Sequence, residues 1–172
     1  MISRYALGPY GWVMALCFAA WAAASALLFV ALAPHASSSL DRVGQILLLA
    51  ASVGLAMAAR FPMDPVGTPR ADMSFSGKMH GIAFLVGVPA LVLAASILSL
   101  SLARHGSHAA TPLLLLTAAI WLSLIAMIAI GAMVGPDHGT NPRVPWLFGW
   151  VNRLLMVAYS LWLIVVAWPM AQ

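Results

Sequence analysis

Hydrophobic and polar positions divide the chain into five long apolar runs separated by short polar segments. The runs cover residues 11–33, 43–60, 81–103, 112–134 and 145–170. A helix needs about 20 apolar residues to cross the roughly 30 Å hydrocarbon core of a bilayer, and each run is close to that length. The runs lack the alternation of a half-buried strand. The pattern therefore predicts an all-α fold, an integral membrane bundle of five transmembrane helices in a single domain.

Composition strengthens the membrane interpretation. Hydrophobic residues make up 63% of the 172 positions and charged residues only 7%, whereas soluble domains carry about a quarter charged residues. Too little polar sequence remains to cover a water-soluble core. The net charge of +4 is spread over the loops, and no basic run could follow a nucleic-acid backbone. The composition thus predicts a lipid bilayer as a partner and excludes nucleic acid.

The first apolar run is predicted to stay in the protein as a membrane span. A signal peptide is the competing interpretation, because Ala31-Leu32-Ala33 resembles a small-residue cleavage site. The run is, however, longer than the apolar core of about 7–15 residues that signal peptides have. Its many alanines make the helix slim, as Ala51, Ser52 and Gly54 do for the second run. Small faces let helices approach closely in lipid, either inside one bundle or against another subunit.

Basic residues suggest an orientation in the membrane. With five crossings, the N-terminus lies on the same side as the loops 61–80 and 135–144. That side carries Arg4, Arg60, Arg70, Lys78, Arg143 and Arg153, whereas Arg42 and Arg104 lie on the other. Because Lys and Arg accumulate in cytoplasmic loops, the count predicts a multi-pass protein of the bacterial inner membrane with a cytoplasmic N-terminus.

Polar side chains gather at one end of the predicted bundle. The end of the second helix, the start of the third, the end of the fourth and the start of the fifth must meet there. The ionisable and amide side chains at this end are Asp64, Asp72, His80, Asp137, His138, Asn152 and Arg153. We expect this end to be the only place where several ionisable groups converge.

Arg153 lies about eight residues into the last run, or about 12 Å along a helix. Charged side chains at such depth usually face a partner or a wet cavity. Arg153 is therefore a candidate to hold an anion or a lipid headgroup, oriented by Asp64 or Asp137 and helped by the neighbouring Asn152. The alternatives are a structural ion pair and an arginine that extends to the membrane surface.

Asp64 and His80 are the candidate catalytic residues, as acid/base or ligand groups. The competing roles are structural: Asp64 would bond local backbone amides in the turn 61–65, and His80 would be a hydrogen-bonded residue between helices. The chain has no HExxH motif and no close His or Cys pair, so no metal site is predicted. No histidine lies in the middle of a span, and no cofactor is predicted.

Four segments together resemble a known family. They are Tyr5–Met14 before the first helix, Phe61–Pro65 after the second, His80-Gly81 at the third, and Asn152–Leu154 in the last. Their order and spacing resemble the multi-pass prokaryotic membrane family called domain of unknown function 998 (DUF998). The resemblance covers nearly the whole chain and implies a fold type, because the family carries no settled activity.

The resemblance also raises two expectations of its own. Members of the family typically have six spans, and the helix that would precede Tyr5 is missing from this sequence. Either the start of the chain has been lost or a neighbouring subunit fills the gap. In a six-span member with a cytoplasmic N-terminus, the Asp64 loop would face outward, which is the opposite of what the charge count predicts.

Two functions remain open at this point. The short loops, the absence of a catalytic motif and the slim helices favour a non-catalytic accessory subunit of a larger bacterial membrane complex, of the respiratory or photosynthetic type. Other membrane subunits would then be its partners. The alternative is a membrane enzyme or a lipid-headgroup-binding protein that uses Asp64, His80 and Arg153.

Overall fold

The computed structural model describes residues 7–65, 68–134 and 143–168. In these ranges the chain forms five long helices and two short 3₁₀ turns. The long helices are α1 (Gly11–Leu32), α2 (Ser39–Arg60), α3 (Phe75–Arg104), α4 (Ala110–Val134) and α5 (Arg143–Ala167); the turns are η2 (Ala33–His35) and η3 (Arg70–Asp72). Each long helix contains a stretch long and apolar enough to cross a membrane. The prediction of an all-α membrane bundle is confirmed.

Two helices begin earlier than the apolar pattern predicts, because serines cap polar first turns. Ser38 accepts a hydrogen bond from the Asp41 amide at 3.1 Å, and Asp41 accepts one from the Ser38 amide at 2.9 Å, which makes a capping box. Ser74 accepts one from the Gly77 amide at 3.0 Å. Such caps satisfy amide groups that would otherwise lack partners. As a result α3 begins at Phe75, and His80 lies inside the helix rather than at its start.

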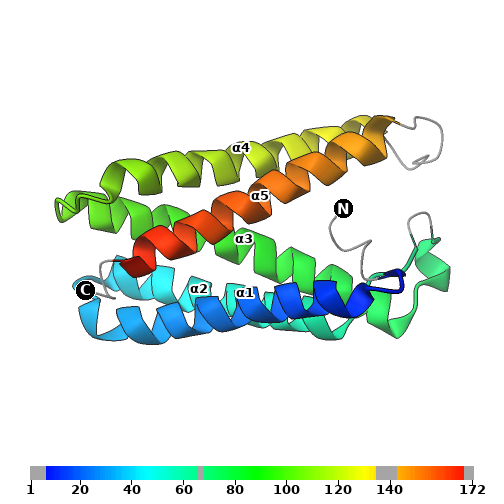
Figure 1. The fold of residues 1–172 in the computed structure, drawn as a ribbon, viewed down its shortest axis with the longest axis horizontal. Helices are drawn as coiled ribbons and strands as arrows, with labels where there is room; N and C mark the ends of the chain where they lie inside the picture. Colours follow the sequence, from blue (N-terminus) through cyan, green and yellow to red (C-terminus); the bar gives the residue numbers. More distant parts are fainter. Residues whose placement is uncertain (1–6, 66–67, 135–142, 169–172) are drawn as a thin grey trace.

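The helices are arranged as a three-helix layer covered by a hairpin. Helices α1 and α2 pack side by side, α3 packs against α2, and α4 and α5 form an antiparallel pair that meets α3 through α4 (Figure 1). Helix α5 runs obliquely from its start beside α4 toward the C-terminal end of α1. The N-terminal half of α5 is thus separated from α1, while the C-terminal halves of the two helices meet.

Hydrogen bonds fasten the C-terminal half of α5 to α1. The Trp21 Nε1–H donates to Ser160 Oγ at 2.9 Å, and Ser25 Oγ lies 2.7 Å from the Tyr159 hydroxyl. Ser25 and Tyr159 are both fully buried. Throughout the described ranges, every buried side-chain nitrogen or oxygen has a hydrogen-bond partner. This is required in lipid, where an unpaired polar group is costly.

Helices α2 and α3 approach each other closely at two glycines. A Cβ built on Gly54 would lie 2.5 Å from the Cα of Gly87, so the two backbones touch at this crossing. Ala51 and Ser52 are buried beside Gly54. The small face of the second helix therefore packs inside the bundle. This is the first of the two alternatives in the sequence analysis, the second being packing against another subunit.

Candidate functional site

Asp64 closes the loop that joins α2 to α3. Its Oδ2 accepts a hydrogen bond from the Ser74 amide at 2.8 Å, and its Oδ1 accepts one from the Ser74 hydroxyl at 2.7 Å. Ser74 in turn caps α3 through the Gly77 amide. The carboxylate lies so close to α3 that a Cβ on Gly77 would be 2.0 Å from Oδ2. Asp64 therefore has a structural role, but its amide partner is the N-cap residue of α3 rather than an amide of the turn 61–65.

His80 connects α3 to the end of α2 and to α1. Its Nδ1 lies 2.8 Å from the carbonyl oxygen of Phe61, which can only accept, so Nδ1 carries a hydrogen. The ring also meets the ring of Phe18 edge-on, with centroids 6.4 Å apart. These contacts fix the orientation of the imidazole at the membrane edge of the bundle.

A pocket opens beside His80, where α5 is separated from α1. Its outer part has a volume of about 280 Å³ and is lined by Asp64, Thr68, His80 and Asn152 together with apolar residues. Its inner part has a volume of about 60 Å³ and is apolar, with Leu91, Leu155 and Met156 in its wall. Both parts share His80, Phe84, Met127 and Asn152. The two parts therefore adjoin along these residues, with a polar part at the mouth and an apolar part deeper in the bundle.

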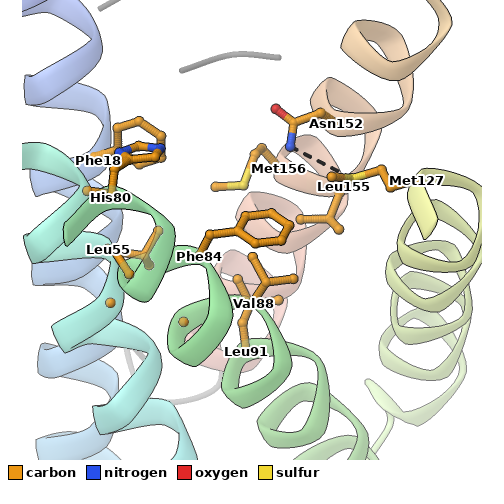
Figure 2. Close-up of a pocket in the computed structure, with 14 residues that line it drawn as sticks. Phe18, Leu55, His80, Phe84, Val88, Leu91, Met127, Asn152, Leu155 and Met156 are labelled. Atoms are coloured by element: carbon orange, nitrogen blue, oxygen red, sulfur yellow. Dashed lines mark hydrogen bonds between the residues drawn. The ribbon is translucent and has the colours of Figure 1, made fainter. Parts of the chain in front are cut away.

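Figure 2 shows how the helices surround the inner part of the pocket. Phe18 and His80 lie on one side, and Met127, Leu155 and Met156 on the other. Phe84 extends from α3 toward α5, with Val88 and Leu91 below it. All five long helices contribute lining residues, so the pocket depends on the whole bundle.

The structure brings only some of the predicted site residues together. Asp64, His80 and Asn152 line the same pocket. Asn152 also donates to the Met127 sulfur at 3.8 Å. The half-buried Arg153 places its guanidinium over the Trp150 ring, 5.1 Å from the centroid. Asp137 lies outside the described residues, so the proposed orientation of Arg153 by Asp137 stays a prediction.

Two further residues of the predicted polar end, Asp72 and His138, are not among the described residues that line the pocket. Asp72 is exposed in η3, and His138 lies outside the described ranges. Among the residues that the structure describes, no group of three or more His, Cys, Asp or Glu side chains could hold a metal ion.

The expectation that ionisable groups converge at only one end is wrong. At the opposite end, Asp41 is only 5% exposed and accepts hydrogen bonds from Ser37, Ser38 and Ser101. His105 lies 3.3 Å from the Ser37 hydroxyl. The sequence contained a signal for this cluster, because Ser38 followed three residues later by Asp41 is a capping-box pattern. The pairing with Ser101 depends on how α2 and α3 cross and has no local signal.

Five helices that are long and apolar enough to cross a membrane make this chain a multi-pass membrane protein in a lipid bilayer. The chain belongs to the family described as protein of unknown function (DUF998), whose model matches residues 1–169. The resemblance found in the sequence is thereby confirmed. No curated protein and no solved structure shows significant similarity to the chain.

Proposed function

We propose that the protein binds an amphiphilic molecule, such as a membrane lipid, in the pocket between α3 and α5. The observation that carries this proposal is that a polar cavity and an apolar cavity adjoin, with His80, Phe84, Met127 and Asn152 in the walls of both. Ligand pockets are usually apolar with a few polar groups that fix orientation. The pocket thus matches the two halves of an amphiphile.

The chemistry of the mouth suits a headgroup at the membrane edge. Asp64 supplies a carboxylate, and Asn152 and His80 supply polar groups that can orient a headgroup. The volume of about 280 Å³ is well above the roughly 10–15 Å³ that a single water needs in a cavity. A compact polar headgroup fits this space, and the apolar part of about 60 Å³ beyond Phe84 has room for the first carbons of an apolar chain.

The accessory-subunit role predicted from the sequence stays a prediction. It was based on the short loops, the absence of a catalytic motif, the slim helices and the missing first span. Gly54 and Ser52 now account for the slim face of α2 by packing inside the bundle, against Gly87 and the Ala22 carbonyl. The pocket is the more specific feature, so lipid-headgroup binding, the alternative of the sequence analysis, is favoured over a docking role.

Filling the pocket tests the proposal. Val88 lines the inner part, whereas Val86, on the same helix, is 45% exposed on the outer surface. We expect Val88→Trp to lower the amount of co-purifying lipid, measured by native mass spectrometry in mild detergent, by about tenfold, which corresponds to 1.4 kcal/mol. Val86→Trp is the matched control and should retain the lipid. Equal retention by both variants would show that the pocket is not the binding site.

The mouth is tested separately with two glycines of α3. In Gly77→Ala the new methyl group would lie 2.0 Å from the Asp64 carboxylate and must displace it, whereas a Cβ on Gly81 meets no atom within 4 Å. Both glycines line the mouth. Gly77→Ala is therefore expected to weaken retention of the same lipid several-fold and Gly81→Ala to leave it unchanged. A Gly77→Ala protein that binds normally would remove Asp64 from the proposed site.

For the location, we propose the bacterial inner membrane with the mouth of the pocket on the cytoplasmic side. Arg60, Arg70 and Lys78 lie at that end, and Arg42 and Arg104 at the other. Alkaline phosphatase needs disulfides that form only in an oxidising compartment such as the periplasm. A phosphatase inserted after His108 should therefore be active, whereas one inserted after Arg70 should be inactive. The reverse pattern would invert the proposed orientation.

A further inference from the structure

A second cavity lies at the end of the bundle opposite Asp64. It has a volume of about 170 Å³ and lies where the α1–α2 connection meets the end of α3. Its polar lining residues are His35, Ser37, Asp41, Gln45, Ser101 and His105. No Lys or Arg is among the described residues that line it. The proposed lipid pocket does not include any of these residues.

Gln45 presents a hydrogen-bond acceptor to this cavity. Its side chain is only 6% exposed, and its Nε2 donates to the Leu32 carbonyl at 2.8 Å. Because a carbonyl can only accept, this bond fixes which end of the amide is nitrogen. None of the hydrogen bonds in the described part of the chain uses the amide oxygen of Gln45, which lines the cavity. Because no buried side-chain oxygen in these ranges lacks a partner, this oxygen is accessible, and it is available to accept a hydrogen bond from a ligand.

Asp41 supplies negative charge to the same cavity. Its carboxylate accepts four hydrogen bonds: from the Ser37 amide at 3.0 Å, the Ser37 hydroxyl at 2.8 Å, the Ser38 amide at 2.9 Å, and the Ser101 hydroxyl. Four donors match the roughly four lone-pair positions of an ionised carboxylate. Asp41 therefore holds a fixed charge at the wall of the cavity rather than a free ligand position.

The two histidines add further acceptors. The Nδ1 of His35 lies 3.1 Å from the Ala31 carbonyl, and the Nδ1 of His105 lies 2.8 Å from the Ser101 carbonyl. Each Nδ1 must therefore donate, and in the neutral imidazole the Nε2 is then an acceptor. The His105 Nε2 is 3.3 Å from the Ser37 hydroxyl, whose hydrogen already has the closer Asp41 oxygen. The cavity thus collects acceptors around one negative charge.

From this arrangement we propose that the cavity binds a primary ammonium group. Such a group carries one positive charge and three N–H donors, which complements Asp41 and the acceptors of Gln45, His35 and His105. A metal ion is the poorer fit, because the described residues contain no group of three His, Cys, Asp or Glu side chains placed to hold one. The ammonium can belong to an aminophospholipid headgroup or to a free primary amine.

The location of the cavity favours the headgroup as the source. The cavity lies where α1 ends and α2 begins, at the edge of the membrane-spanning stretches. Two exposed arginines are next in sequence to residues that line the cavity: Arg42 follows Asp41, and Arg104 precedes His105. A zwitterionic headgroup could place its ammonium in the cavity and its phosphate at these arginines.

Lipid binding to the purified full-length protein tests the proposal without any variant. Native mass spectrometry should show phosphatidylethanolamine binding about tenfold more tightly than phosphatidylcholine with the same acyl chains, because the trimethylated headgroup has no N–H donor. The Val88→Trp protein should show the same preference, since that residue lies in the other pocket. Equal binding of the two lipids would overturn the proposal, whichever variants fold.

A variant then places the preference at this cavity. Gln45→Met removes the amide oxygen at similar volume and should reduce the preference for phosphatidylethanolamine to about twofold or less. His108→Gln is the control, because His108 is exposed at the same end and does not line the cavity. Competition by millimolar ethanolamine would identify a free amine as sufficient, and its absence would identify the lipid headgroup. A preference that survives Gln45→Met unchanged would show that the ammonium binds elsewhere.

Discussion

Gly54→Val is expected to destabilise the bundle more than any other single substitution in α2. The new Cβ would lie 2.5 Å from the Cα of Gly87, 2.9 Å from its nitrogen and 3.0 Å from the Ala83 carbonyl oxygen. All three atoms belong to the backbone of α3, so no side-chain rotation relieves the clash and the helices must separate. Overpacking of this kind costs about 3 kcal/mol or more. Unfolding in a titration of denaturing detergent, followed by circular dichroism, should occur at a clearly lower detergent fraction.

Gly131→Val is the matched control for this prediction. Gly131 also lies in an apolar helix, but a Cβ there meets no atom within 4 Å. The control should unfold like the unmodified protein, which separates the effect of contact from the effect of replacing glycine in a helix. A Gly54→Val protein as stable as the control would mean that α2 and α3 do not cross at these glycines.

The glycine pair also shows the limit of what the sequence could predict. Small residues in the second run indicated close packing, and Gly54 was among them. Its partner Gly87 had no distinguishing mark, because α3 is apolar on all sides and its sequence does not define which face meets a neighbour. Gly131 in α4, by contrast, is exposed, and a Cβ there would meet no atom within 4 Å. The number of long helices followed from hydropathy, but the polar first turns of α2 and α3 and the rotation of each helix did not.

The residues of the candidate site also fall into those that could be predicted from the sequence and those that could not. The meeting of Asp64, His80 and Asn152 followed from connectivity, because three chain segments must return to one membrane face. Phe84 and Met127 could not be predicted, since their neighbours in sequence are equally apolar and only packing determines which side chain faces the pocket. The cluster around Asp41 could have been predicted in part, because its capping box is local. Ser101, from α3, joins it only through the fold.

Trp162→Ala is the second substitution with a large expected effect, because Trp162 joins three helices. Its side chain is fully buried, and its Nε1–H donates to Ser99 Oγ at 2.8 Å, from α5 to α3. Ser99 lies 2.9 Å from Thr117 Oγ1 of α4. The indole also stacks on Tyr159, with centroids 6.0 Å apart and ring planes at 8°. Removing the indole leaves both a large void and a weakened polar connection between the layers.

The expected loss is about 3 kcal/mol, at the lower end of the range for Trp→Ala in soluble cores. The lower end applies because a separated helix in a bilayer keeps its apolar side chains in lipid, so packing is lost rather than burial from water. Trp168→Ala is the matched control, since Trp168 is 65% exposed, and its unfolding should change little. Trp162→Phe keeps much of the volume and removes only the hydrogen bond, which is worth about 1 kcal/mol. Its unfolding midpoint should therefore lie between those of the other two variants, and an order that places Trp168→Ala lowest would contradict the described position of α5.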